Sequence, residues 1–216
     1  MSGNVRPTVR TNVYVDGFNL YFGCLKGTPY KWLNIAKMCR LSLPANYVVQ
    51  RIRYFTALVS PRPTNPQIHV RQQAYLRALA TTPRLDIHYG SYLEGVKRRP
   101  LARPVAGLPA FVDVLNTEEK GSDVNLATYL LFDAFNNEFD AAVIVTDDSD
   151  LEEPMRIVRH HFKKHVRVLS PRGQSRVLSR TATRFQQITL AALQGAQFPR
   201  TLSDANGTIT KPSRWK

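Results

Sequence analysis

Apolar residues along the chain follow two spacings, one typical of buried strands and one typical of amphipathic helices. Runs rich in β-branched and aromatic residues predict strands over 12–15, 50–58, 85–93, 111–115, 140–146 and 165–169. Apolar residues three and four positions apart predict helices over 31–41, 67–80, 122–135, 149–163 and 176–193. Because strands alternate with helices, we expect an α/β fold: a three-layer α/β/α sandwich with a mainly parallel central sheet.

The remaining segments divide the chain into one domain and two tails. We expect residues 1–10 to form a flexible basic arm, 11–195 to form the domain, and 196–216 to form a basic C-terminal tail, disordered from Asn206 onwards. Residues 94–109 hold three prolines and several basic side chains, which favours an exposed basic loop. Ser149 followed by Glu152 matches a capping box, which predicts a helix start there.

Carboxylates follow directly where two of the predicted strands end. Asp16 comes after the apolar run 13–15, and Asp148 and Asp150 come after the run 143–146. In open parallel sheets, ligands bind just beyond the carboxyl ends of the strands. Carboxylates gathered at one edge repel each other unless a cation neutralises them, so this arrangement predicts a site for a hard metal ion.

Asp123 is the fourth acidic candidate, at the start of the helix predicted over 122–135. Helix N-termini favour carboxylates, so capping alone would explain its position, whereas the functional interpretation directs it into the same cleft. Four carboxylates, without His or Cys at metal-binding spacing, favour Mg²⁺ or Mn²⁺ over Zn²⁺. Asn19 is neutral and follows the first strand end, so it is suited to orienting a water or a carboxylate without adding charge.

The formal net charge is +14, and such an excess usually reflects a polyanionic partner, most often nucleic acid. Twelve of the 16 acidic residues lie between Asp113 and Glu153, and the rest of the chain is strongly basic. A membrane surface or plain solubility would also explain the charge, but no helix combines basic residues with a clean lipid-facing side. We therefore expect wide contacts with phosphates around one cation-binding centre.

Two groups of basic residues are candidate contacts for a nucleic-acid backbone. Arginines recur every four residues, which would place several on one side of the helix predicted over 176–193: Arg172, Arg176, Arg180 and Arg184. The second group lies in the predicted basic loop and shortly after it: Lys97, Arg98, Arg99, Arg103 and Lys120. A solvated charged surface is the alternative interpretation of both groups.

Other features narrow the class of protein. Cys24 and Cys39 have no metal-binding spacing, and no apolar run approaches the ~20 residues that span a bilayer. The first ten residues lack the apolar segment of a signal peptide. We expect a cytoplasmic protein with reduced thiols and no membrane partner. Four aromatic residues surround the first acidic motif: Tyr14, Phe18, Tyr21 and Phe22. Some of them must belong to the core and one is available to stack on a base, and the sequence leaves open which one.

Three motifs follow one another in an order known from one family. They are 14–21, 118–127, and 143–151, the last continuing to Pro154 and then to 166–169. On these motifs the chain resembles the NYN domain family, a branch of the PIN-like ribonucleases. The resemblance implies a Rossmann-like PIN fold and metal-dependent hydrolysis of RNA phosphodiester bonds.

Carried over residue by residue, the resemblance assigns the catalytic and metal-binding positions. It places the metal-binding acids at Asp16, Asp123, Asp148 and Asp150, with Asn19 as the accompanying polar residue and Mg²⁺ or Mn²⁺ as the cofactor. Asp147 departs from the small or neutral residue expected before Asp148, and its role stays open. The leading hypothesis is a Mg²⁺- or Mn²⁺-dependent endoribonuclease with RNA as its partner.

Three alternatives remain beside it. A catalytically inactive RNA-binding or scaffold module of the same fold would bind RNA without cutting it. A phosphatase or other phosphoryl-transfer enzyme usually carries a second Asp two residues after its nucleophile, where this chain has Phe18. A nucleotide-binding Rossmann enzyme would need a Gly-rich phosphate loop after the first strand, which the sequence lacks.

Overall fold

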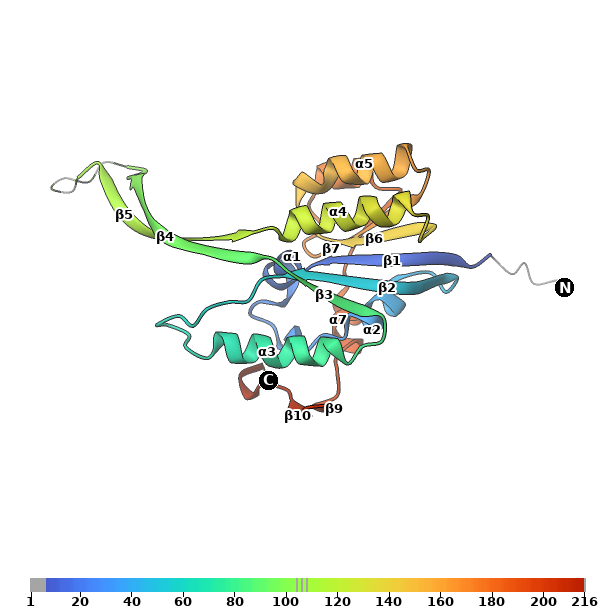
Figure 1. Cartoon of the computed structure of the whole chain (residues 1–216), viewed down its shortest axis with the longest axis horizontal. Helices are drawn as coiled ribbons and strands as arrows, with labels where there is room; N and C mark the ends of the chain where they lie inside the picture. The colour runs from blue at the N-terminus through green and yellow to red at the C-terminus, as the bar shows by residue number, and fades with distance from the viewer. Residues whose placement is uncertain (1–6, 104, 106, 108, 216) are drawn as a thin grey trace.

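The computed structural model describes residues 7–103, 105, 107 and 109–215. Its centre is a six-stranded sheet in the order β3-β2-β1-β6-β7-β8, and every neighbouring pair is parallel (Figure 1). The strands are β1 Val9–Asp16, β2 Tyr47–Thr56, β3 Leu85–Tyr89, β6 Ala141–Val145, β7 His165–Ser170 and β8 Arg184–Gln187. The parallel central sheet predicted from the sequence is confirmed.

Helices cover both faces of this sheet (Figure 1). One face carries α4 Ser122–Phe135, α5 Glu152–His160 and α6 Arg176–Thr181, whose apolar residues share one core cluster. The other face carries α2 Ile35–Ser42, α3 Ile68–Ala80 and α7 Leu190–Gly195, which contribute to a second cluster. The three-layer α/β/α sandwich is confirmed.

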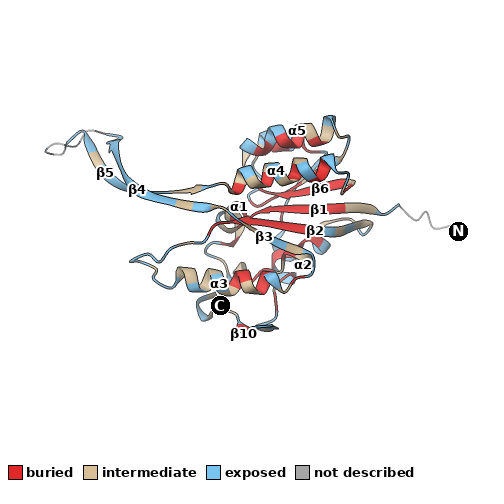
Figure 2. Cartoon of the chain, in the orientation of Figure 1, coloured by how far each residue is buried: buried red, intermediate tan, exposed pale blue. Residues whose placement is uncertain are grey.

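The central strand β1 shows why its sequence is almost continuously apolar. Val13 and Val15 point into the core under α2 and α3, whereas Tyr14 between them points into the core under α4 and α5. All three side chains are fully buried, and Figure 2 shows the same burial across the central strands. A strand covered on both faces needs apolar residues at consecutive positions, as parallel sheets require.

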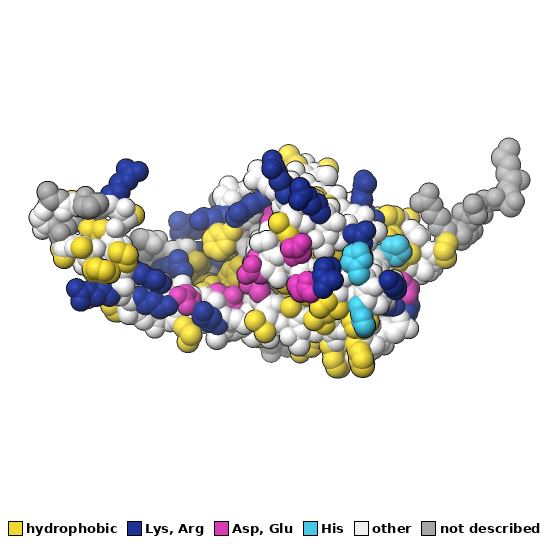
Figure 3. All heavy atoms as spheres, turned by 90° about the horizontal axis from the view of Figure 1, so that it is seen from above, with side chains coloured by type: hydrophobic (Ala, Val, Ile, Leu, Met, Phe, Trp, Pro, Cys, Tyr) yellow, Lys and Arg dark blue, Asp and Glu magenta, His cyan; other side chains and the backbone are white. Residues whose placement is uncertain are grey.

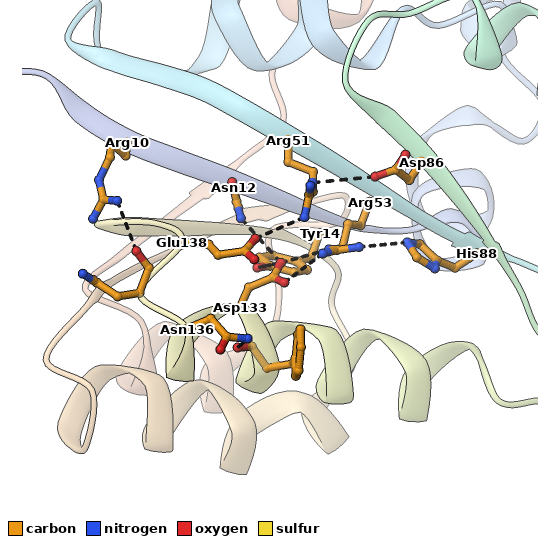
Figure 4. A network of polar contacts seen from close by, with 12 residues as sticks. Arg10, Asn12, Tyr14, Arg51, Arg53, Asp86, His88, Asp133, Asn136 and Glu138 are labelled. Carbon is orange, nitrogen blue, oxygen red and sulfur yellow. Dashed lines mark hydrogen bonds and ion pairs between the residues drawn. The ribbon is translucent and has the colours of Figure 1, made fainter.

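A buried polar network joins the sheet to α4 (Figure 4). The carboxylate of Asp133, which is fully buried, accepts hydrogen bonds from Arg53 Nε at 2.9 Å, Arg53 Nη2 at 2.8 Å and Tyr14 Oη at 2.7 Å. Burial and the charge of Asp133 raise the pKa of Tyr14, so its hydroxyl stays protonated and donates. The guanidinium of Arg53 also lies over the Tyr129 ring, 4.4 Å from its centroid. The buried charges of Asp133 and Arg53 therefore compensate each other, and Tyr14 and Tyr129 add further favourable contacts.

Two strands outside the central sheet form a long antiparallel ribbon. They are β4 Ser91–Pro100 and β5 Phe111–Lys120, which pair from Ser91 opposite Lys120 to Pro100 opposite Phe111. The ribbon projects from the body of the molecule (Figure 1). The loop expected over 94–109 is therefore wrong up to Pro100, because these residues pair with β5 in an antiparallel ladder. Residues 104, 106 and 108 of the expected loop lie outside the described residues.

Two other expected elements are divided in the structure. The strand expected over 85–93 is two strands, since β3 ends at Tyr89 and β4 begins at Ser91. The helix expected over 176–193 is also wrong: α6 ends at Thr181, the edge strand β8 follows, and α7 begins at Leu190. Thr189 starts α7 by accepting a hydrogen bond from the Ala192 amide, which interrupts any continuous helix.

Both chain ends form regular structure where they are described, although the sequence predicts a flexible arm and a disordered tail. Residues 1–6 of the predicted arm lie outside the described residues, but Val9 and Arg10 belong to β1. The disordered tail expected from Asn206 is wrong for residues 206–215. There β9 Thr201–Asp204 pairs with β10 Gly207–Thr210, Ile209 is buried, and Trp215 packs against Trp32 at 6.1 Å between ring centroids. Lys216 is not described.

In the described part of the chain, none of the helices has the length and apolar character that crossing a bilayer demands.

We expect Asp133→Asn to lower the free energy of unfolding by about 3 kcal/mol, because it leaves the Arg53 charge buried without its partner. The double variant Asp133→Leu/Arg53→Met should recover most of this loss, since it removes both charges together. Urea denaturation measures both. The control is Glu153→Gln, which breaks the exposed Glu153–Arg156 pair and should change stability by less than about 0.5 kcal/mol. An Asp133→Asn effect as small as that of the control would contradict the role of this network.

Candidate functional site

Asp16 ends β1 at the carboxyl edge of the sheet and is almost fully buried. Its carboxylate accepts hydrogen bonds from the Asn19 amide nitrogen at 2.9 Å, from Asn19 Nδ2 at 2.7 Å and from Thr146 Oγ1 at 3.2 Å. Gly17 follows because a Cβ there would lie 2.7 Å from the Phe55 carbonyl oxygen. Asp16 also caps the short helix α1 Gly17–Leu20, so both its position and its orientation are fixed.

The end of β6 lies beside the end of β1, since Val15 pairs with Val145. The Asp148 amide donates to Thr146 Oγ1 at 3.0 Å, and the Asp150 amide donates to Asp148 Oδ1 at 3.0 Å. Asp148 thus caps a 3₁₀ turn over Ser149–Leu151 that leads into α5. The capping box expected from Ser149 and Glu152 is not what starts this helix, because Asp148 takes the capping role.

Asp147 is bound to β7 and to the loop that follows it. Its carboxylate accepts a hydrogen bond from Ser170 Oγ and another, at 2.7 Å, from the Arg172 amide nitrogen. Ser170 Oγ in turn accepts from the Gly173 amide at 2.6 Å. This side chain therefore holds the loop after β7, which gives the extra carboxylate a structural role.

The start of α4 brings Asp123 to the same edge of the sheet. The helix is capped by Glu119, whose Oε1 accepts from Ser122 Oγ at 2.7 Å and from the Ser122 amide at 3.2 Å. Gly121 between them has a φ of 95°, a conformation that favours glycine. Asp123 is thus not needed as the cap, and its side chain is available to the site.

Asp16, Asn19 and Asp123 line one hollow of about 310 Å³. Glu119 joins them from β5, and the remaining walls come from Phe18, Phe22, Arg62, Tyr92 and Thr117. Figure 3 shows acidic side chains gathered from the base of the ribbon onto the body, with Lys and Arg side chains on either side. Asp148 and Asp150 are not among the lining residues, but Asp148 connects to Asp16 through Thr146.

The acids at this edge influence one another electrostatically. Burial is the largest cause that raises the pKa of Asp123 to about 6. The charges of Asp16, Asp148, Glu119 and Asp150, in decreasing order, contribute the rest of this rise. Burial also raises the pKa of Asp16, partly opposed by the hydrogen bonds from Asn19 and Thr146, and the charge of Asp148 adds to the rise. Such mutual repulsion is what a bound cation would relieve.

The donor set fits a water-rich Mg²⁺ or Mn²⁺ site better than a closed protein cage. Among the residues that the structure describes, no three His, Cys, Asp or Glu side chains lie close enough together to hold one ion. Mg²⁺ typically uses one or two carboxylates and completes its shell with water and substrate phosphate. Asp16 and Asp123, in one hollow with their pKa values raised, suit that kind of binding.

The predicted RNA-binding residues are divided between the ribbon and the segments that follow β7. Lys97, Arg98 and Arg99 lie on β4, with Arg98 over the Phe111 ring, 5.7 Å from its centroid. Lys97 and Lys120 both pair with Glu118 on β5, the latter at 3.0 Å.

The arginines of the other predicted group are divided between two elements and a loop. Arg172 lies in the loop after β7, whereas Arg176 and Arg180 are exposed on α6. Arg184 is in β8, so the expected continuation of this group along one helix is wrong.

The sequence analysis did not identify four residues of the hollow: Arg62, Tyr92, Thr117 and Glu119. Glu119 binds the first residue of α4 and lines the hollow. Tyr92 and Arg62 reach the site from segments distant in sequence. Tyr92 pairs with Glu119 in the ribbon, so recognition of this antiparallel ladder from the sequence would have indicated Tyr92 and Glu119 together.

Comparisons with known proteins agree on the fold and add one unexpected relative. The model of the NYN domain family matches residues 10–189. A curated relative, 6-hydroxy-3-succinoylpyridine 3-monooxygenase HspA of Pseudomonas putida (strain DSM 28022 / S16), is 30% identical over 236 residues, which cover 96% of this chain and 75% of that protein. A solved structure of a protein of unknown function from Vibrio parahaemolyticus RIMD 2210633 is similar, with a TM-score of 0.54. It is 17% identical and covers 88% of this chain and 98% of its own, so it supports the fold alone.

In chelator and without metal, we expect Asp123→Asn to raise the free energy of unfolding at pH 8 by about 1 kcal/mol, a value reduced for solvent screening. The pKa of Asp123 is about 6 in the folded protein against an ordinary 3.8, so the folded state binds this proton more tightly. The natural protein therefore gains stability from Asp123 as the pH falls through 6 toward 4, and loses that contribution as the pH rises again. The advantage of the variant should shrink over the same range.

Urea denaturation at a series of pH values measures this difference. Asp86→Asn, at an exposed aspartate on β3, is the control and should show no such trend. An advantage of Asp123→Asn that is the same at every pH would contradict the raised pKa.

Proposed function

Because the chain belongs to the NYN domain family, we propose that it is a metal-dependent ribonuclease that hydrolyses RNA phosphodiester bonds. The observation that most supports this proposal is that Asp16 and Asp123, which are far apart in sequence, open into one hollow beside Asn19. The raised pKa values of both acids and the net charge of +14 add to it. RNA as the partner, Mg²⁺ or Mn²⁺ as the cofactor and the cytoplasm as the compartment are parts of the same proposal.

Asp16 and Asp123, which both line the hollow, are the candidate direct ligands of the ion. Asp148 and Asp150, the other two metal-binding candidates, lie outside that lining and would act on the ion by their charge. A divalent ion, when bound there, lowers the pKa of a water and offsets the charge that develops on the attacked phosphate. Asp16 is held rigidly for this task by Asn19 and Thr146. Asn19 also accepts a hydrogen bond from the Asp147 amide at 3.3 Å, so it positions the two strand ends relative to each other without adding charge.

A catalytically inactive RNA-binding module of the same fold is the first alternative. It shares the basic surface and the fold, so it predicts the same RNA binding. It differs because Asp→Asn changes in the hollow would leave binding intact and no metal would bring about cleavage.

Oxygenation of a pyridine is a second candidate, favoured by the 30% identity to the monooxygenase over 96% of this chain. Incubation with 6-hydroxy-3-succinoylpyridine and O₂, with and without a two-electron reductant, tests it by chromatography of the pyridine. Consumption of the pyridine that survives Asp16→Asn would assign that activity to a different site.

We expect the purified protein to cut single-stranded RNA with Mn²⁺ or Mg²⁺ and to stop in chelator. Asp16→Asn and Asp148→Asn should each lower the cleavage rate on the order of 100-fold, because each removes a charge that the cation needs. Gel analysis of a labelled oligoribonucleotide measures the rate. The matched control is Asp86→Asn, which removes an exposed carboxylate on β3 and should leave the rate unchanged. Undiminished cleavage in chelator would overturn the proposal.

We expect Arg99→Gln to reduce the salt dependence of RNA binding by about one counterion, as the loss of one phosphate contact would. Lys97→Gln, two residues away on the same side of the ribbon, should have a clearly smaller effect, because Lys97 already pairs with Glu118. In the described part of the chain, Arg99 has no such ion pair. Fluorescence anisotropy over a salt series compares the two slopes, and equal slopes would contradict this difference.

A further inference from the structure

The hollow beside the carboxylates has a second half that is aromatic. Phe18 and Phe22 come from the helical turns after β1, and Tyr92 comes from the base of the ribbon. The Phe18 and Phe22 rings are stacked with centroids 6.5 Å apart, and the Phe18 and Tyr92 rings meet edge to face at 5.8 Å. The three rings therefore form one connected aromatic group next to Asp16 and Asp123.

These rings do not serve the cores of the protein. Phe22 is 52% exposed, and none of the three rings belongs to either core cluster. Large aromatic side chains held together at the surface, instead of in the core, are typical of binding sites.

Cations accompany the aromatic group. Lys26 Nζ lies 5.2 Å from the centroid of the Phe22 ring, and Arg62 lines the hollow from the loop before α3. Carboxylates for a cation, rings for a planar base and basic groups for phosphates are the three contacts that a nucleotide unit within a polynucleotide chain would need.

We propose that the rings of Phe18, Phe22 and Tyr92 form a subsite for one unpaired nucleobase, adjacent to the phosphate on which the carboxylates act. This proposal rests on the proposed ribonuclease function and adds to it the form of the substrate. The hollow of about 310 Å³ has room for one base and not for a duplex.

The subsite determines strandedness and not sequence. A base inside a duplex is already stacked on its neighbours and paired, so it must leave the helix before it can lie on these rings. Every base has a flat face, and stacking on an aromatic ring therefore accepts all four. The protein should bind single strands and loops of any sequence in preference to duplex.

The test measures binding in chelator, so that it does not depend on cleavage. The probe is a short single-stranded oligoribonucleotide that carries one 2-aminopurine, whose fluorescence falls when it stacks. The natural protein should bind it and quench it. Phe22→Leu should weaken binding by about 10-fold and abolish most of the quenching, which is within the range of base–aromatic stacking.

Three comparisons make the test specific. Tyr92→Leu should weaken binding, whereas Tyr92→Phe, which keeps the ring, should not. The matched control is Phe135→Leu, at a Phe that is 75% exposed on α4 and outside the hollow, and it should bind as the natural protein does. The same probe annealed to its complement should bind more weakly, and Phe22→Leu should not change that binding.

The outcomes separate the subsite from the nuclease. If Phe22→Leu and Tyr92→Leu bind and quench the probe like the natural protein, the subsite is overturned, even if the protein cleaves RNA. If binding and quenching depend on both rings but no metal brings about cleavage, the subsite stands and the ribonuclease proposal fails.

Discussion

The hydrogen bonds that join the end of β1 to the end of β6 are the constraint on which the rest of the candidate site depends. Asp16 accepts from Thr146, and Asn19 accepts from the Asp147 amide, so residues 130 and 128 positions apart are held as one unit. The parallel pairing of Val15 with Val145 makes these bonds possible. The strand pairing brings the two ends together, and these bonds fix Asp16 beside the turn that carries Asp148.

The same constraint explains why burial and charge are tolerated there. Asp16 is nearly fully buried and its pKa is raised, which is a cost that a purely structural aspartate would not require. Its hydrogen bonds from Asn19 and Thr146 compensate part of this cost. By contrast, the equally buried Asp133 is compensated by Arg53 and Tyr14. Asp133, on α4, is thus neutralised by a cation, whereas Asp16, at the edge of the sheet, has only neutral hydrogen-bond donors.

The central sheet and the position of the acids could be predicted from the sequence because they depend on local signals. Strands covered on both faces have consecutive apolar residues, and Asp16 with Gly17 marks the end of one of them. The ribbon gives no such signal, because β4 and β5 are mostly exposed on both sides and pair only with each other. The order of the C-terminal segment was missed because single apolar residues, such as Ile209 and Trp215, dock on a core built by others. Asp147 was left open because its partner Ser170 lies on another strand.

The ribbon leaves the body after β3 and returns at α4, and its strands are hydrogen-bonded to no strand of the central sheet. Its length is therefore independent of the register of the six central strands. A hairpin of this kind can be extended, shortened or exchanged during evolution while the carboxylates at the sheet edge keep their geometry. In this architecture, the residues that the ribbon contributes can therefore change independently of the central sheet that positions the carboxylates.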